Sequence, residues 1–522
     1  MPKDLQMKEM RRKERCHKIQ MPVPKKIISL LYSLCFAFLL TSCATSKYNS
    51  YNPASKIPAS KLKEDLAVLK EIFEADHPSL YWYTQKDSVD YYFNETMQSV
   101  NDSITELEFK NKVAWFVSKI KCGHTSVRSS DAYEEYMAIH RPSRFPLLIK
   151  SWDDSLILLG SLNKQDTLLK RGTVITSIEN YSNRTLLDSM FRFISTDGNG
   201  NNFKSQAVSV NFPLYYSFAF PLKDSFSIRY IDTLGNEKQT YVQLNKPVKD
   251  TSKEKKKQEE EFPRPSRNEI KKFILASKRN ISYDYENSIA YMRLATFSGG
   301  SLRSFFRNAF EELHEKKINN LVIDLRENSG GSINMDILLT RYLKDKPFHV
   351  ADTVAAVNRN ISYSKYIRPC FPYRMAMKFA TSKKEDGKYH FRQLEDHKYK
   401  PFSNDHFNDH IYIIQGGYTF SAAAMFVLQL KGQQNVTVVG EETGGGNYGT
   451  SAVHLPDIIL PNSKVRVVLP LYRLVFDSTQ IKNEKGIQPD VYVAPSSVDI
   501  RNGIDPKMKK IKELIESGKK KG

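Results

Sequence analysis

The sequence is poor in cysteine and lacks the motifs that usually mark a protein metal site. Only five of its 522 residues are cysteines, and neither a Cys-x-x-Cys nor a His-Glu-x-x-His segment occurs. Two cysteines, Cys122 and Cys370, lie beyond the first 43 residues. Two cysteines do not make a disulfide framework, and no metal-ligand spacing is present. We therefore expect no metal site.

Long apolar runs are also scarce, with one exception near the N-terminus. The run IISLLYSLCFAFLL follows Lys25 and Lys26 and ends at Thr41-Ser42-Cys43. This run is short for a membrane span, and a basic stretch, an apolar stretch and then small residues are typical of a secretory signal. The segment LTSC also resembles the lipobox of bacterial lipoproteins. That resemblance implies removal of residues 1–42 and acylation of Cys43, whereas an ordinary signal peptide with a chance cysteine is the alternative.

The chain is basic, but its basic residues are scattered. Its formal net charge is +20, and removal of residues 1–42, with nine basic and three acidic side chains, leaves +14. Such a charge favours anionic membrane surfaces or acidic partners. Because no nucleic-acid-binding module is present among the Lys and Arg residues, we expect a solvated surface and no nucleic-acid partner.

Patterns along the chain predict a multidomain α/β protein. At 26% charged and 40% hydrophobic residues the composition is globular. Helical periodicity and the capping box Thr105-Glu106-Leu107-Glu108 mark the N-terminal region, short strands and turns follow, and the last part alternates strand and helix. We expect a signal peptide (1–42), a tether (43–60), a helical region (61–130), a β-rich domain (131–246), a charged linker (247–272), an α/β core (273–500) and a basic tail (501–522).

One serine near the C-terminal end raises a question about chemistry. In GGYTFSAAA, Ser421 stands between a strand-like run and three alanines. Serine is a favoured helix N-cap, so a structural role is the simpler reading. A serine at a strand-to-helix turn also lies next to unpaired N–H groups and the positive end of the helix dipole, which would stabilise an oxyanion. Ser421 needs partners before a catalytic role follows.

Five segments in a fixed order carry a family resemblance. They are LVIDLRENSGG (321–331), GGYTFSAAA (416–424), VGEETGGGNYG (439–449), LPNSKVRVVLP (460–470) and GIQPDVYV (486–493). Together they resemble the C-terminal processing peptidases and tricorn-type serine peptidases over roughly Ser288 to Val493. The resemblance implies a crotonase-like ββα catalytic core, a PDZ-like β-rich insert before it, and hydrolysis of unfolded or C-terminal polypeptide segments.

The resemblance also implies the catalytic residues. Ser421 falls on the family nucleophile. One branch uses a lysine base, but GEETGGGNYGT contains none, and Lys431 and Lys464 lie outside the expected motif. The other branch uses a histidine, and KCGHTSVR resembles its Gly-His-Thr signature, so His124 is the expected general base. Glu484 lies near the position of the acidic third member, although its reading as an exposed loop residue stays open.

The expected oxyanion donors are backbone N–H groups. Ala422, which follows the nucleophile, would supply one, and Gly299 or Gly300 in ATFSGGS would supply the second. The segment DLRENSGG is interpreted as scaffolding, with an Asp324–Arg326 ion pair and a tight glycine turn.

We therefore expect a lipid-anchored serine endopeptidase of the cell envelope, in the outer membrane and facing the periplasm. It would need no cofactor and would bind its polypeptide substrate extended along a strand edge. Two alternatives remain. One is an inactive peptidase fold that binds peptides or apolar ligands. The other makes Cys122 the reactive group beside His124.

Overall fold

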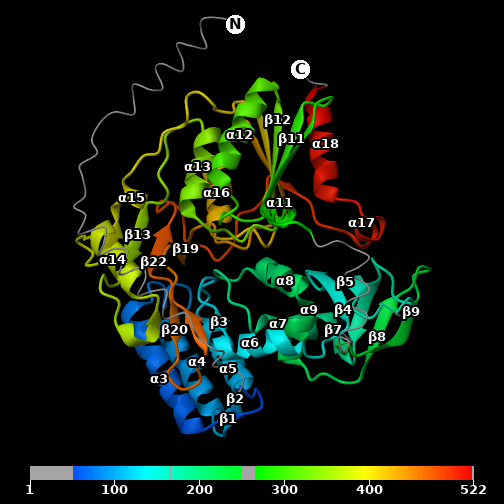
Figure 1. Cartoon of the computed structure of the whole chain (residues 1–522), viewed down its shortest axis with the longest axis vertical. Helices are drawn as coiled ribbons and strands as arrows, with labels where there is room; N and C mark the ends of the chain where they lie inside the picture. Colours follow the sequence, from blue (N-terminus) through cyan, green and yellow to red (C-terminus); the bar gives the residue numbers. More distant parts are fainter. Residues whose placement is uncertain (1–50, 165, 248–264, 520–522) are drawn as a thin grey trace, which may run out of the picture. The chain divides into compact units, whose positions relative to one another are not determined.

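The computed structural model describes residues 51–164, 166–247 and 265–519. The chain divides into Met1–Asn52 and a compact unit, Pro53–Gly522, which contains every element below (Figure 1). The signal peptide, Cys43, the first part of the tether and most of the charged linker lie outside the described residues. Within the described ranges, no helix is both long and apolar enough to cross a bilayer.

The N-terminal region is helical, and its helices share a core with the C-terminal part of the chain. The predicted capping box is confirmed: Thr105 and Glu108 exchange hydrogen bonds at the start of α5. Leu66 and Phe116 are buried in one cluster with Val467 and Leu474. The elements are β1 (Lys56–Ile57), α3 (Ala59–Asp76), α4 (Lys86–Ser99), β2 (Ile104–Thr105), α5 (Glu106–Lys119), β3 (Val127–Arg128) and α6 (Asp131–His140).

The next region is an antiparallel sheet with strand order β4-β5-β6-β8-β9, and β7 pairs with β6. It also contains three helices, which the strand-and-turn pattern did not predict. Phe145, Phe212, Tyr216 and Phe226 form the centre of its buried core. The elements are β4 (Leu147–Trp152), β5 (Ser155–Ser161), β6 (Val174–Ile178), β7 (Tyr181–Ser182), α7 (Asn183–Phe191), α8 (Asn201–Val210), α9 (Phe212–Ala219), β8 (Ser225–Ile231) and β9 (Glu237–Gln243).

The C-terminal part alternates strand and helix, as predicted, around a six-stranded sheet of order β10-β11-β12-β17-β18-β23. Neighbouring strands of this sheet run parallel, except that β10 and β11 are antiparallel. The prediction of an α/β core with a largely parallel sheet is therefore confirmed. Its strands are β10 (Arg279–Asp284), β11 (Ile289–Leu294), β12 (Asn320–Asp324), β17 (His410–Gln415), β18 (Val436–Gly440) and β23 (Val491–Tyr492), and its helices are α11 (Arg267–Lys278), α12 (Leu302–Glu315), α13 (Ile333–Leu343) and α16 (Ala422–Leu430).

Helices cover both faces of this sheet (Figure 1). On one face α12, α13 and α16 bury apolar side chains against β11, β12 and β17. On the other face lies α18 (Pro506–Lys519), which follows α17 (Ser497–Asn502). Ile511 and Ile515 of α18 pack on Val322 and Ile414, and each buried isoleucine contributes about 2 kcal/mol. The expected basic tail thus contains a docked amphipathic helix, because its apolar residues recur on one helical face.

Three smaller sheets complete the part of the unit that the structure describes. Two have the strand orders β15-β16-β13-β22-β19 and β14-β20-β21-β3, and β1 pairs with β2 in the third. Val127 of β3 pairs with Val467 of β21, which joins the segment after His124 to the C-terminal region. The remaining elements are β13 (Thr353–Ala356), η2 (Ser364–Tyr366), β14 (Ile367–Arg368), α14 (Phe371–Ala380), β15 (Thr381–Lys383), β16 (Tyr389–Phe391), α15 (Arg392–Glu395), β19 (Gly449–Ala452), β20 (Asp457–Ile459), β21 (Arg466–Val468) and β22 (Tyr472–Val475).

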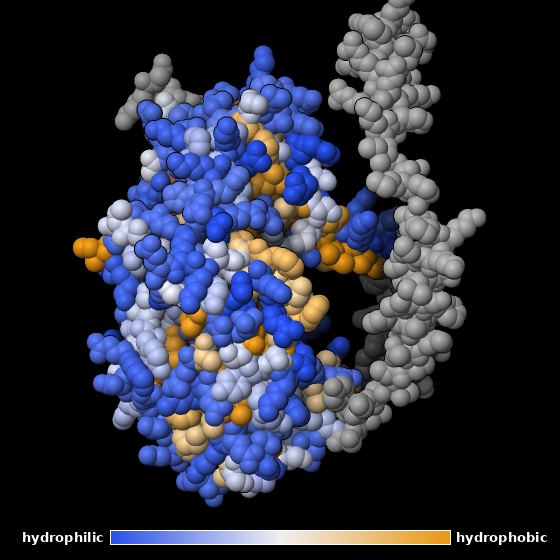
Figure 2. Space-filling model, turned by 90° about the vertical axis from the view of Figure 1, so that its left-hand side faces the viewer, coloured by the Kyte–Doolittle hydropathy of each residue, from blue (hydrophilic) through white to orange (hydrophobic). Residues whose placement is uncertain are grey.

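The surface agrees with the composition. On the face shown in Figure 2, hydrophilic residues predominate, and apolar residues occur in scattered patches. The scatter fits a solvated, charged exterior.

Candidate active site

Ser421 lies at the turn between β17 and α16, and its backbone is strained. Its φ is +54° and its ψ is −128°, a region that residues other than glycine rarely adopt. Such strain is kept where the surroundings impose it and is common at functional sites. Although Ser421 occupies the N-cap position of α16, its side chain makes no capping hydrogen bond. The hydroxyl is therefore available for another partner.

That partner is His124. The Nε2 atom of His124 lies 2.9 Å from Ser421 Oγ, although 297 residues separate the two in the chain. His124 follows the end of α5 and precedes β3, whose pairing with β21 fixes this segment against the C-terminal region. The ring also packs against Phe420, with 4.8 Å between ring centroids. Packing and pairing hold the imidazole at the serine.

The other ring nitrogen of His124 leads to a buried carboxylate. Thr450 Oγ1 lies 3.2 Å from His124 Nδ1 and donates a 2.8 Å hydrogen bond to Asp197 Oδ2. The second oxygen of Asp197 accepts the Gly123 N–H at 2.9 Å. Since an ionised carboxylate only accepts, the Thr450 hydroxyl donates to Asp197 and accepts from His124 Nδ1–H. Nε2 is then the free acceptor that faces the Ser421 hydroxyl.

Burial shifts the pKa of both titratable members of this network. Burial lowers the pKa of His124 to about 4. Burial also raises the pKa of Asp197 to about 6, against the lowering effect of hydrogen bonds from Gly123, Thr450 and Gly446. Near neutral pH the histidine is therefore neutral and the carboxylate ionised. This is the combination that a general base with a charged support requires.

Glu484, the expected third member, is bonded elsewhere. Its carboxylate forms a 2.8 Å ion pair with Lys121, and both side chains are about one third exposed. The Nδ1 atom of His124 instead contacts the Thr450 hydroxyl. In this structure Thr450, and not the expected Glu484, is therefore the neighbour of that ring nitrogen. Sequence reasoning missed Thr450 and Asp197. Thr450 does end the quoted segment GEETGGGNYGT, and Asp197 begins the turn DGNGN, but nothing local connects either residue with His124.

The oxyanion side of the site also differs from the expectation. Ala422 is the first residue of α16, where N–H groups have no intrahelical acceptor. Gly330 approaches the nucleophile so closely that a Cβ there would lie 2.6 Å from Ser421 Cβ and 3.0 Å from Ala422 N. Gly299 and Gly300 instead lie beside Lys278. The glycine turn of DLRENSGG, interpreted as scaffolding, therefore adjoins the nucleophile.

The same segment holds the expected ion pair. Arg326 and Asp324 are 2.7 Å apart, and Arg326 also pairs with Asp505 at 2.7 Å. The Gly330 N–H donates to Asn328 Oδ1. Phe297 and Gly331 form an isolated parallel β-bridge beside this turn. In it, Phe297 N–H donates to Gly330 O, and Ser332 N–H donates to Phe297 O. The N–H of Gly331 takes no part in these bonds.

The other candidate groups have different surroundings. Lys431 pairs with Asp490, and Lys464 donates to the Pro461 carbonyl. Cys122 is buried, and burial raises the pKa of its thiol to about 11. A thiol with such a pKa carries almost no thiolate near neutral pH. These contacts favour neither a lysine base nor a cysteine nucleophile.

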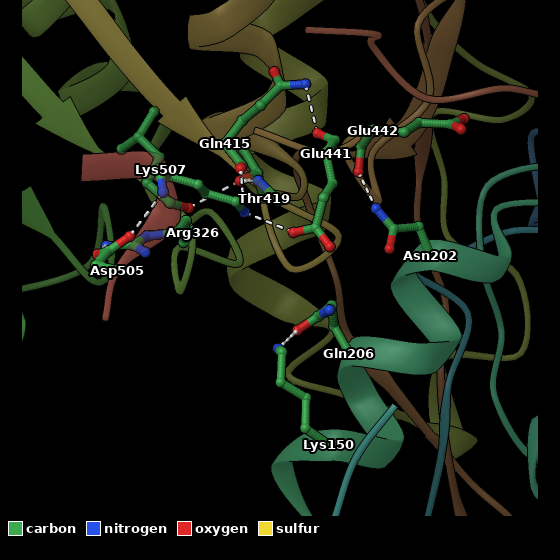
Figure 3. Close-up of polar contacts among 12 residues, drawn as sticks. Lys150, Asn202, Gln206, Arg326, Gln415, Thr419, Glu441, Glu442, Asp505 and Lys507 are labelled. Atoms are coloured by element: carbon green, nitrogen blue, oxygen red, sulfur yellow. Dashed lines mark hydrogen bonds and ion pairs between the residues drawn. The ribbon is translucent and has the colours of Figure 1, made fainter. Parts of the chain in front are cut away.

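Polar contacts position the loop after β18 (Figure 3). Lys507 of α18 donates to Glu441 Oε2 at 2.6 Å and to the Gln415 carbonyl at 3.0 Å. From α8, the Asn202 side chain donates to the Glu442 carbonyl at 2.5 Å. In Figure 3, Gln206 points from the same helix toward Lys150. Helices α8 and α18 thus hold the start of the segment that leads to Thr450.

Aromatic packing connects the β-rich domain with the nucleophile turn. Phe203 of α8 lies against Phe420, the residue before Ser421, with 4.9 Å between ring centroids. It also stacks near Tyr418 at 5.8 Å. The domain that precedes the core therefore contributes to the surroundings of the serine.

Comparisons with known proteins show a family match and a likeness of fold. Residues 288–493 match the description of peptidase family S41. No curated protein matches the chain significantly. The solved structure of mature CPAF is 11% identical, with a TM-score of 0.61 over 88% of this chain and 96% of that one. Mature CPAF complexed with lactacystin is 12% identical, with a TM-score of 0.62 over 88% and 98%.

At such identities the two solved structures establish likeness of fold alone. The family match covers the strands and helices that carry Ser421, Thr450 and the glycine turn at Gly330. Members of family S41 are serine-type peptidases, which act on polypeptides. Residues 288–493 are thus a domain of peptidase family S41, and the chain is a serine-type peptidase, a hydrolase.

Proposed function

We propose that the chain is an endopeptidase in which Ser421 attacks the peptide bond and His124 is the general base. The single observation that carries this proposal is the 2.9 Å contact between His124 Nε2 and Ser421 Oγ. His124 removes the hydroxyl proton while Oγ bonds to the scissile carbonyl carbon. Imidazole that is neutral near pH 7 suits this step.

The developing oxyanion is stabilised by backbone N–H groups. We assign Ala422 as one donor and Gly331 as the second, because the first belongs to the open turn of α16 and the second adjoins Gly330 at the nucleophile. One such donor is worth about 3 to 4 kcal/mol of transition-state stabilisation. This assignment replaces Gly299 and Gly300.

The tetrahedral intermediate then collapses and the C–N bond breaks. His124 returns its proton to the leaving amine, which leaves an ester on Ser421. A water molecule gives a proton to His124 and attacks the ester carbon, and the same steps in reverse order release the acid and restore the serine. Asp197, acting through Thr450, stabilises the imidazolium that exists during each transfer.

The fold and location belong to the same proposal. We assign the core as crotonase-like and the β-rich domain as PDZ-like on the motif resemblance. The lipobox-like LTSC segment supports acylation of Cys43 and an outer-membrane anchor that faces the periplasm. Membrane fractionation tests the anchor: a Cys43→Ala variant should leave the membrane fraction, and continued retention would contradict lipidation.

Cleavage of unfolded proteins tests the activity. The form 44–522, which contains the compact unit 53–522, is incubated with a mixture of unfolded proteins, and new termini are identified by mass spectrometry. Ser421→Ala and His124→Ala should each abolish cleavage. Cleavage that persists in His124→Ala would indicate a lysine as the general base. No cleavage above the Ser421→Ala background would favour the inactive, peptide-binding alternative.

A further inference from the structure

A cavity of about 600 Å³ lies between the N-terminal helical region and the β-rich domain. On one side it is lined by Tyr83, Tyr92 and the end of α5. On the other side it is lined by the end of α7 and the start of α8, with Phe191 among them. Its size falls in the range of ligand sites rather than of packing defects.

The cavity carries an excess of positive charge. Lys119, Lys121, Arg192 and Lys204 line it, whereas Asp188 is the one lining carboxylate among the described residues. Lys121 pairs with Glu484. Among the residues that the structure describes, no ion pair involves any of the other three lysine and arginine side chains. Three cations therefore face the cavity without a carboxylate within ion-pair distance.

The pKa values of two of these lysines are lowered, as expected for partly buried positive charges that lie close together. Burial lowers the pKa of Lys204, and the charges of Lys119 and Lys121 lower it further. Burial and the neighbouring Arg192 likewise lower the pKa of Lys119. Like charges gathered in a partly desolvated place destabilise one another, so an anion that enters the cavity relieves this repulsion.

The walls of the cavity are also the segments that hold the catalytic network. Lys121 lies three residues before His124, and Gly198 directly follows Asp197. The Gly198 N–H donates to the Lys121 carbonyl at 3.1 Å, and the Asn199 N–H donates to the Glu484 carbonyl at 3.1 Å. A ligand bound here would therefore contact the two segments that contain His124 and Asp197.

A second cavity, of opposite charge, limits where an anion can bind. It has a volume of about 620 Å³ and shares Asp188, Phe191, Asn199 and Asn201 with the first. Its lining includes the carboxylates Asp153, Asp154, Glu441 and Glu442. An anion is attracted to the basic cavity and repelled from the acidic one, so an anion that enters here would bind in the basic cavity.

We propose that the basic cavity binds a carboxylate of the polypeptide substrate, either an acidic side chain or the C-terminal group. This inference rests on the proposed function. Arg192 and Lys204 would bind the carboxylate, since arginine and lysine form charge-assisted hydrogen bonds with it. Tyr83, Tyr92 and Phe191 would pack on the apolar part of the same residue.

Binding to an inactive variant tests the inference without any need for catalysis. Fluorescence anisotropy of a labelled twelve-residue peptide is measured with Ser421→Ala in the 44–522 form. Three peptides are compared: one with two glutamates and a free C-terminus, one with glutamines in place of the glutamates, and one with the glutamates and an amidated C-terminus. The peptide that carries the carboxylate bound by the cavity should bind about tenfold more tightly than the peptide that lacks it. In 1 M salt most of this difference in affinity should disappear.

Cavity variants show where this discrimination arises. In the Ser421→Ala background, Arg192→Gln should reduce the preference for the carboxylate-bearing peptide to about threefold, and adding Lys204→Gln should remove it. Lys63→Gln, an exposed lysine of α3 outside the cavity, is the matched control. Because Lys204 is partly buried, thermal unfolding checks that its variant folds, and the single Arg192→Gln variant keeps the test decisive if it does not.

The outcomes separate the two proposals. Equal binding of all three peptides, or a preference that survives in both cavity variants, overturns the carboxylate site. Loss of the preference in Lys63→Gln as well also overturns it, because a general charge effect would then explain the binding. If the cavity variants lose discrimination while the active chain cleaves nothing, the site stands and the proposed activity fails.

Discussion

The Oγ1 atom of Thr450 lies 3.2 Å from Nδ1 of His124, and its hydroxyl donates to the buried carboxylate of Asp197 at 2.8 Å. This contact sets the tautomer of the histidine, because a hydroxyl that donates to a carboxylate can only accept from Nδ1–H. It also connects three parts of the chain that are remote in sequence.

The first prediction concerns the hydroxyl of Thr450. Thr450→Val keeps the shape but removes the bonds to His124 and Asp197, and it leaves two buried polar groups without their partner. We expect kcat/KM to fall by about ten- to a hundredfold. Thr450→Ser, which keeps the hydroxyl, should retain activity within a few-fold. Equal activity of the valine and serine variants would show that the hydroxyl has no part in positioning His124.

A second prediction distinguishes the two acidic candidates. Asp197→Asn removes the charge behind Thr450 and should lower kcat by about ten- to a hundredfold while KM changes little. Glu484→Gln breaks only the partly exposed ion pair with Lys121 and should change kcat by less than about threefold. Steady-state kinetics on one cleaved peptide decide between them, and the opposite ranking would restore Glu484 as the third member.

The third prediction is the pH dependence of kcat/KM. A general base works unprotonated, so activity falls as the pH falls through the pKa of His124, which burial places at about 4. A shallower loss should precede it near pH 6, where Asp197 becomes protonated. In Asp197→Asn the step near pH 6 should vanish while the lower step remains. A single wild-type step at pH 6.5, unchanged in that variant, contradicts the network.

The fourth prediction tests the glycine turn at the nucleophile. Gly330 has a φ of +101°, and a Cβ there would lie 2.6 Å from Ser421 Cβ. Gly330→Ala should therefore displace the serine and reduce kcat by about a hundredfold or more. Gly235→Ala is the control, because Gly235 also has a positive φ, of +84°, but no atom within 4 Å of the added carbon. If circular dichroism shows that both variants are folded, and their kcat values are equal, Gly330 does not shape the site.

A fifth prediction addresses the cysteine alternative. Because Cys122 is buried and burial raises the pKa of its thiol to about 11, iodoacetamide should leave activity unchanged at pH 7.5. Mass spectrometry then identifies which thiols were alkylated. Inhibition that parallels alkylation of Cys122 would make the thiol part of the chemistry.

The sequence predicts the parts of the site that lie within motifs. Ser421 and His124 both lie in short, recognisable segments, and the structure brings them into contact. The alternation of strands and helices likewise predicts the α/β core, because apolar periodicity reflects burial directly.

Contacts between distant segments were not predictable in this way. Asp197 lies in a turn of the β-rich domain and reaches Thr450 only because α8 packs against the nucleophile turn. Gly299 and Gly330 both occur in Gly-Gly turns, and only the pairing of strands decides which turn meets Ser421. Local spacing carries no information on such pairings. The docking of α18 is not evident from the sequence because its lysines obscure the apolar face formed by Met508, Ile511 and Ile515.

Active-site labelling tests the central claim most directly. The 44–522 form is treated with a fluorophosphonate, which reacts with a serine only when a neighbouring base activates it. Peptide mapping by mass spectrometry should place one adduct on Ser421, and the rate of labelling should fall by at least about a hundredfold in His124→Ala. An adduct on another serine, or equal labelling of Ser421 with and without His124, would contradict a Ser421–His124 catalytic pair.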